Sequence, residues 1–217
     1  KDEATQKKEV SETMEMNKSY STHSQVVKNS RQFQDFKFEF NTCINEVNQS
    51  LQHIINNSRD INIGKLLTQT TELLTISDTS MGVLDMLSNM RDYDDSTYAH
   101  SLNVAIICRI FGQWLRLPAH DLDVLTVAGL LHDLGKLLIS QDIIKKPGRL
   151  SDSEFRIVQM HPQLGYDKLK MLNIDNRIKN AALLHHEKCD GSGYPFGLTI
   201  DKIDPFARIL TIADVYD

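Results

Sequence analysis

The chain has 217 residues, a formal net charge of −5 at pH 7 and 41% apolar residues, which is typical of one large or two small domains with a buried core. The acidic balance argues against binding to duplex nucleic acid, because such binding draws on clustered Lys and Arg. No run of about 18 apolar residues occurs, so we expect no membrane span. Three cysteines lie far apart in the sequence, which argues against a Cys-rich zinc site and fits a reducing, cytoplasmic location.

Residues 1–90 predict a helical module at the start of the chain. Residues 1–30 are polar and predict a frayed segment or the extension of a helix. From Phe33 onward, apolar residues recur at spacings of three and four, at Cys43, Ile44, Val47, Leu51, Ile54 and Ile55, and again within 63–74 and 81–90. Two heptads are too few for a coiled coil, so a packed helical hairpin is favoured. The sharper hypothesis is a regulatory module that relays a signal or forms a homodimer.

An acidic, polar stretch at 91–95 marks the expected boundary of a second unit, residues 91–217. Helices are predicted over 101–116, 121–138, 152–160, 164–172, 175–187 and 205–217. Ser151 and Glu154 predict a capping box at one helix start, and Asp121 is expected to cap the helix that follows Pro118. No segment shows a clean polar–apolar alternation with a period of two. The sequence therefore predicts an all-α protein, in which a helical bundle follows the N-terminal helical module.

Several of the eight histidines lie beside strongly apolar segments. His132-Asp133 follows the apolar stretch 124–131, and His185-His186 follows 181–184. Imidazoles and carboxylates in such surroundings need hydrogen bonds or a metal. The candidates are His100, His132, Asp133, His161, His185, His186 and Asp214. One metal takes about four to six ligands, so this set suits two metal ions bridged by a carboxylate, and mixed nitrogen and oxygen ligands favour Fe, Mn or Zn.

A second His-Asp pair, His120-Asp121, provides an internal comparison. It follows Pro118 in a polar turn, where a helix cap explains the aspartate better than a ligand role does. His23 and His53 also lie in polar contexts. We therefore expect these three histidines to be surface residues without a ligand role. Glu187, next to the His-His pair, is expected to orient an imidazole.

Two longer motifs resemble those of the HD-GYP family. The run His132-Asp133-Leu134-Gly135-Lys136 matches the HD-x-G-K signature, and residues 185–195, HHEKCDGSGYP, match the HHE-x-x-DGSGYP signature. Three shorter runs resemble further motifs of the family in the same order: Lys146-Pro147-Gly148 with Leu150, His161-Pro162 and Ala213-Asp214. The resemblance covers roughly residues 95–217, and an eleven-residue match that contains GYP is specific.

The resemblance implies an HD-type helical bundle that hydrolyses the phosphodiester bonds of cyclic di-GMP, or a related cyclic dinucleotide, to linear pGpG or GMP. It implies two divalent metal ions, Fe or Mn, held by the seven candidates above. It gives catalytic roles to Asp133 and Lys136. The residues that it implies at the substrate are Lys136, Lys146, Gly193, Tyr194 and Pro195.

Two departures from the family pattern shape these expectations. Ser96 stands where family members with three metals have a glutamate, which favours a two-metal site. The chain ends at Asp217, before a basic segment that resembles RPYRK in the family, so we expect the domain to be truncated at its C-terminus.

Three alternatives stay open. The GYP segment disfavours a different HD hydrolase that acts on nucleoside phosphates or alarmones. A catalytically weak receptor, which binds a cyclic dinucleotide and signals through residues 1–90, is compatible with the same residues. A helical domain with purely structural histidines is disfavoured by the number of matching positions. The sequence favours neither cyclic di-GMP nor a hybrid GMP–AMP ring.

Overall fold

The computed structural model describes residues 22–56, 62–91 and 96–217. Within these residues the fold is helical, as predicted, and extended pairing is limited to one isolated bridge between Asp190 and Thr199. The elements in chain order are α2 (His23–Asn29), α3 (Arg31–Ile55), α4 (Ile63–Leu73), α5 (Ser80–Met90), α6 (Thr97–Trp114), α7 (Ala119–Leu131), η1 (Leu134–Leu138), α8 (Gln141–Ile144), α9 (Asp152–Val158), α10 (His161–Leu169), α11 (Asn176–Leu184), η2 (Ile200–Lys202) and α12 (Pro205–Tyr216).

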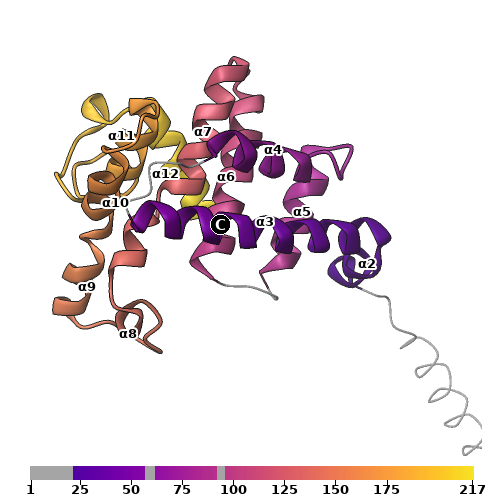
Figure 1. Cartoon of the computed structure of the whole chain (residues 1–217), viewed down its shortest axis with the longest axis horizontal. Coiled ribbons are helices and arrows are strands. Elements are labelled where there is room, and N and C mark those ends of the chain that lie inside the picture. The colour runs from indigo at the N-terminus through magenta and orange to yellow at the C-terminus, as the bar shows by residue number, and fades with distance from the viewer. Residues whose placement is uncertain (1–21, 57–61, 92–95) are drawn as a thin grey trace, which may run out of the picture.

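The packed pair of α6 and α7 forms the centre of the molecule, and α11 and α12 pack against it (Figure 1). The last eight residues of α7 are all buried, and each larger aliphatic side chain among them contributes about 1.5–3 kcal/mol by burial. Gly129 lets the two helices approach closely, because a Cβ there would lie 2.5 Å from Ala105 Cα. This tight pair fixes the positions of the residues at the end of α7.

The apolar stripe of α3 packs against the chain's own helices. Its buried residues are Phe33, Phe36, Phe40, Cys43, Ile44, Val47, Leu51 and Ile54. Helix α3 contacts α4, α6 and η1, and one apolar core runs from Phe33 to Ala213 on α12. The α3–α4 packing agrees with the predicted hairpin, and the seam considered for a coiled coil is buried within the chain.

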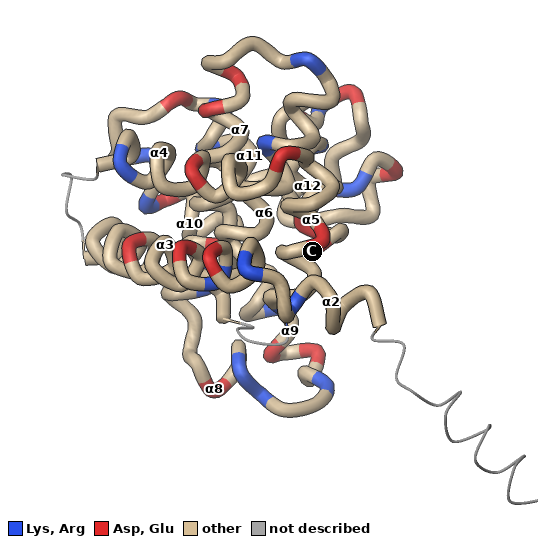
Figure 2. The backbone as a smooth tube through the Cα atoms, turned by 90° about the vertical axis from the view of Figure 1, so that its right-hand side faces the viewer, with Lys and Arg blue, Asp and Glu red and all other residues tan. Residues whose placement is uncertain are grey.

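The prediction for residues 1–30 falls mostly outside the described residues. Its described part forms α2, which begins with a capping box between Thr22 and Gln25. Figure 2 shows Lys and Arg interspersed with Asp and Glu along the described chain. No described helix is long and apolar enough to cross a lipid bilayer.

Two predictions about helix starts have different outcomes. The capping box of Ser151 and Glu154 is confirmed at the start of α9. The cap expected from Asp121 is wrong: Pro118 occupies the N-cap position of α7 without a side-chain bond, and Asp121 Oδ1 instead accepts a hydrogen bond from Arg177 Nη1 at 2.7 Å. An ion pair with α11 therefore takes the place of the cap.

The helix expected over 175–187 ends at Leu184, before His185-His186. Two further predicted helix boundaries shift at the histidine motifs. The helix expected over 121–138 ends at Leu131 and continues after Asp133 as η1. Helix α10 begins at His161 rather than 164, with Pro162 in its first turn. Proline is tolerated there because the first-turn N–H groups have no intrahelical acceptor. In both places the chain turns, which directs a histidine towards the interior.

Candidate metal centre

The structure brings all seven predicted metal ligands together. They form two groups, and within each group the potential ligand atoms lie within 4.8 Å of one another. The groups are Asp133, His161, His185 and His186, and His100, His132 and Asp214. They come from the first turns of α6 and α10, the ends of α7 and α11, and the last turns of α12.

Three histidines at helix ends are held in the same way. Their Nδ1 atoms bond the carbonyl oxygen three residues earlier, at 2.8 Å for His132 and Gly129, 2.7 Å for His161 and Val158, and 2.8 Å for His185 and Ala182. The last carbonyls of a helix lack intrahelical donors, so they accept from Nδ1–H. This bond fixes the tautomer and leaves the Nε2 lone pair free for a metal. The local helix endings therefore orient three nitrogens that could bind a metal.

Asp133 lies between the two groups, and each of its oxygens faces one of them. Its Oδ1 lies 3.3 Å from His161 Nε2 and 3.8 Å from His185 Nε2. Its Oδ2 lies 3.3 Å from His132 Nε2, 3.5 Å from His100 Nε2 and 2.6 Å from Lys136 Nζ. This placement suits a carboxylate that bridges two cations.

Two polar atoms at the centre are buried without a hydrogen-bond partner, His132 Nε2 and Asp133 Oδ1. Leaving such an atom unsatisfied costs about 1–3 kcal/mol. A divalent cation would satisfy both, because imidazole nitrogen and carboxylate oxygen are its usual ligands. The residues present therefore fit metal ions, and the two groups could hold one each.

Burial keeps several imidazoles neutral. It lowers the pKa of His161 to about 3 and that of His186 to about 2, and for His186 the neighbouring His185 acts in the same direction. Burial also lowers the pKa of His185. Neutral imidazole is the form that coordinates a metal. These three histidines are ready to bind at neutral pH.

The carboxylates make the centre favourable for positive charge. Burial opposes ionisation of Asp133, but the charges of His132 and Lys136 outweigh it and hold the pKa of Asp133 well below its usual range. Burial likewise opposes charging of His132, yet Asp133 raises the pKa of His132 to about 10. A metal bound at the same atoms would displace the proton on His132.

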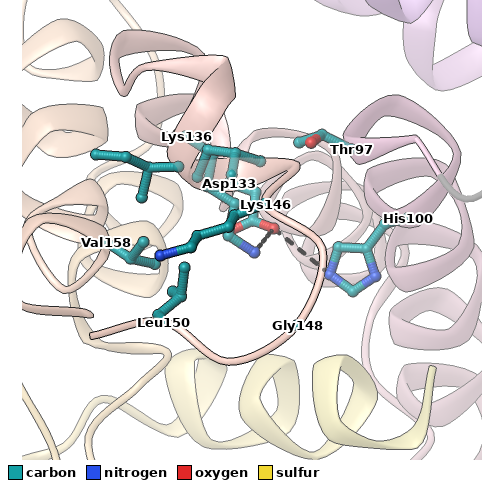
Figure 3. A pocket seen from close by; sticks show the side chains of 10 residues that line it. Thr97, His100, Asp133, Lys136, Lys146, Gly148, Leu150 and Val158 are labelled. Atoms are coloured by element: carbon teal, nitrogen blue, oxygen red, sulfur yellow. Dashed lines mark hydrogen bonds and ion pairs between the residues drawn. The ribbon is translucent and has the colours of Figure 1, made fainter. Parts of the chain in front are cut away.

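A cavity of about 480 Å³ opens beside this centre. Figure 3 shows His100, Asp133 and Lys136 on one side of it, and the loop through Gly148 on another. The pair of α8 and α9 and the loop between them supply its outer wall, through Ile143, Ile144, Lys146, Gly148, Leu150 and Val158. The volume lies within the usual range for small-ligand pockets.

The predicted substrate residues occupy different places. Lys136 and Lys146 both line the cavity, but Lys146 Nζ bonds both carboxylate oxygens of Glu154 at 2.7 Å, so its charge is already paired. Gly193, Tyr194 and Pro195 are not among the residues that line this cavity. They lie beside His186, whose ring stacks on the Tyr194 ring at a centroid distance of 4.7 Å.

The expected role of Glu187 is wrong, because its carboxylate holds the loop after Tyr194 instead of an imidazole. The side chain is buried, and its two oxygens accept hydrogen bonds from Phe196 N at 2.7 Å and Leu198 N at 2.8 Å. The helix-end histidines are oriented by hydrogen bonds to backbone carbonyl oxygens rather than by this carboxylate. Glu187 thus holds the residues that directly follow the GYP segment. The peptide bond between Tyr194 and Pro195 is cis.

Replacing Glu187 with Gln should loosen this loop. The amide offers one acceptor oxygen where the carboxylate offers two, so one part-buried N–H loses its partner, at a cost of about 1 kcal/mol. We expect faster hydrogen exchange at Phe196 and Leu198 and a lower free energy of unfolding in urea. Glu154→Gln, in an exposed capping box, is the comparison, and unchanged exchange at both amides in Glu187→Gln would contradict the assignment.

The remaining histidines lie outside the centre. His120 is exposed, with its Nε2 3.7 Å from the Asp175 carboxylate, and His53 is exposed on α3. His23 is exposed as well and bonds Asp85 Oδ2 at 2.7 Å. Sequence reasoning missed Asp217, which contacts His100. Its spacing of three from Asp214 could have indicated it, because such residues share a helix face.

Comparison with known proteins agrees with this architecture. The sequence profile described as an HD domain matches residues 41–217. The chain belongs to the HD domain family. Cyclic di-GMP phosphodiesterase PA4108 of Pseudomonas aeruginosa is 39% identical over 132 residues, which cover 60% of this chain and 32% of that protein. The 3'3'-cGAMP-specific phosphodiesterase 3 of Vibrio cholerae is 40% identical over 121 residues, 56% of this chain and 26% of that protein.

Structural similarity extends over nearly the whole chain. The HDG"Y"P protein Bd1817 from Bdellovibrio bacteriovorus superposes with a TM-score of 0.67 and 16% identity, covering 98% of this chain and 67% of that one. This likeness concerns the fold. The two signature motifs lie within the matched HD domain, which agrees with the predicted resemblance to the HD-GYP family. The chain spans 32% and 26% of the lengths of the two phosphodiesterases compared above.

Proposed function

We propose that this protein is a metal-dependent phosphodiesterase that opens a cyclic dinucleotide, either cyclic di-GMP or 3'3'-cGAMP. The observation that carries the proposal is the placement of Asp133 between two groups of His and Asp ligands, at the wall of a cavity that Lys136 also lines. Relatives at 39% and 40% identity carry these two activities in their names.

The proposed ligand sets follow the two groups. His100, His132 and Asp214 would hold one ion, His161, His185 and His186 the other, and Asp133 would contribute an oxygen to each. The ions would supply Lewis acidity towards a phosphate oxygen and an activated water. Nitrogen and oxygen donors without a thiolate suit Fe, Mn or Zn, and we propose Fe or Mn because the family resemblance implies these two.

Lys136 is proposed to bind the phosphate that is cleaved. Its ammonium bonds Asp133 Oδ2 at 2.6 Å, which holds it at the cavity wall beside the ligand groups. A positive charge fixed in this place stabilises negative charge that develops on phosphate oxygens. Asp133 therefore positions Lys136 in addition to its ligand role.

Replacing Lys136 with Met should lower kcat/KM by about 10²–10³-fold while both metals stay bound, because one charged donor to the transition state is lost. Lys170→Met is the matched control. Lys170 forms the same ion pair with the aspartate three residues earlier, at 2.6 Å from Asp167, on the exposed surface. Activity is measured by chromatography and metal content by elemental analysis. Equal kcat/KM for both variants would exclude Lys136 from the substrate site.

The function is tested by incubating the anaerobically purified protein, loaded with Mn²⁺ or Fe²⁺, with cyclic di-GMP and separately with 3'3'-cGAMP. Separation of the products by chromatography should show linear pGpG, GMP or the linear mixed dinucleotide. The ratio of the two kcat/KM values then defines the preferred ring. Tight binding without a linear product would overturn the enzyme assignment and favour the receptor.

We also propose that residues 1–90 act as a regulatory or dimerisation module and that the protein works in the cytoplasm. The described cysteines are free thiols, which fits a reducing compartment. A dimer would use the outer face of α3, where Phe38 is 69% exposed, since the opposite stripe is buried within the chain. Sedimentation of the protein and of Phe38→Glu tests this proposal, and equal masses would contradict that face.

A further inference from the structure

His100 is held differently from the three helix-end histidines. It lies in the first turn of α6, where the backbone carbonyl groups already accept hydrogen bonds within the helix. No nearby carbonyl is therefore available to accept a hydrogen bond from the His100 ring. Its Nδ1 instead bonds Asp217 Oδ2 at 2.8 Å, and its Nε2 faces Asp214 Oδ1 at 3.0 Å. One proposed ligand therefore depends on a side chain from the far end of the chain.

Asp217 is itself held in place. Its side chain is 8% exposed, and its second oxygen, Oδ1, accepts a hydrogen bond from Asn103 Nδ2 at 3.1 Å. Asn103 lies on the same helix as His100, and Asp217 follows Asp214 by three residues. The carboxylate thus bridges α6 and the end of α12 directly behind the imidazole, on the side away from the ligand group.

We propose that Asp217 is the positioning residue of His100, an inference that rests on the metal centre of the proposed function. As acceptor of the Nδ1 proton, it fixes the tautomer that leaves Nε2 free for the metal and increases electron donation from the ring. Only the group of His100, His132 and Asp214 depends on this contact. The group of His161, His185 and His186 is held by backbone carbonyls and by packing.

Arg91 attaches this arrangement to the N-terminal helices. It caps the end of α5, and its Nη2 donates to Tyr216 O at 2.9 Å and lies 3.4 Å from Asp217 Oδ1. The position of α5 is in this way linked to His100 through one carboxylate. Because the Arg91 side chain is 45% exposed, its contribution is smaller than that of Asp217.

The test is calorimetric titration of the metal-free whole chain with Mn²⁺, which measures the number of bound ions and their affinities in the wild type and in Asp217→Ala. The wild type should bind two ions. The variant should bind one of them about 10–100-fold more weakly and the other with unchanged affinity. Asp217→Asn keeps an acceptor oxygen for the Nδ1 proton, so it should recover part of the loss. A purely structural role would weaken both ions together and would show no such recovery.

The control is Asp123→Asn, which removes an aspartate paired with Arg109 at 2.8 Å on the outer side of α7 and should leave both affinities unchanged. Arg91→Ala should weaken the same ion as Asp217→Ala, by about fivefold or less. Two ions bound with wild-type affinity in Asp217→Ala and Asp217→Asn would overturn the inference. A wild type that binds two ions but cleaves no dinucleotide would overturn the proposed function alone.

Discussion

Asp133→Asn should lose metal and abolish hydrolysis. Asp133 is buried, and its two oxygens face the two ligand groups, so the substitution removes the one negative charge that both proposed ions share. The metals supply several kcal/mol of transition-state stabilisation, so we expect kcat to fall by about 10³-fold or more. Elemental analysis should find less than two ions per chain, and chromatography should find no linear product.

The matched control for this variant is Asp121→Asn, because the chain contains a second His-Asp pair. Asp121 forms an ion pair with the half-buried Arg177. It belongs to neither of the two groups of candidate ligands. We expect full metal content and activity, with a loss of stability of about 1 kcal/mol or less. Full metal content in Asp133→Asn, or metal loss in Asp121→Asn, would show that the ligand assignment is wrong.

Gly135→Ala should disrupt the fold around the centre. A Cβ at this position would overlap His161 O and lie 2.7 Å from Gly165 N, and both are backbone atoms that cannot rotate away. Helix η1 would have to move from α10, which would separate Asp133 from His161. We expect a loss of about 3 kcal/mol in the free energy of unfolding, together with loss of metal and of hydrolysis.

Gly64→Ala gives the comparison for this glycine. It lies in the first turn of α4, where the nearest atom to an added Cβ would be Asn62 Oδ1 at 3.5 Å, an ordinary contact. Alanine favours a helix over glycine by about 1 kcal/mol, so this variant should be equally or more stable. Urea unfolding of both variants measures the difference. Equal stability of Gly135→Ala and the wild type would disprove the close contact of η1 and α10.

Much of the fold and of the ligand set follows from the sequence, because the determining signals are local. Apolar periodicity predicted the helices, and the stripe of α3 is buried as its spacing required. The histidines of the motifs lie at helix ends or beside prolines, where free carbonyls orient a ring within three residues.

Other features were decided only by contacts between distant segments. The loop contacts of Glu187 and the bond from Asp121 to Arg177 replaced roles that neighbouring residues had suggested, and Lys146 pairs with Glu154. His100 meets Asp217 across 117 positions, and no local pattern states which carboxylate lies behind which imidazole. Side-chain periodicity fixes which face of a helix is buried, but the partner on that face depends on how the helices pack. The sequence by itself therefore determined the candidate ligand types and the helices that present them, whereas the tertiary structure determined which carboxylate oxygen faces each group and which residues hold these side chains in place.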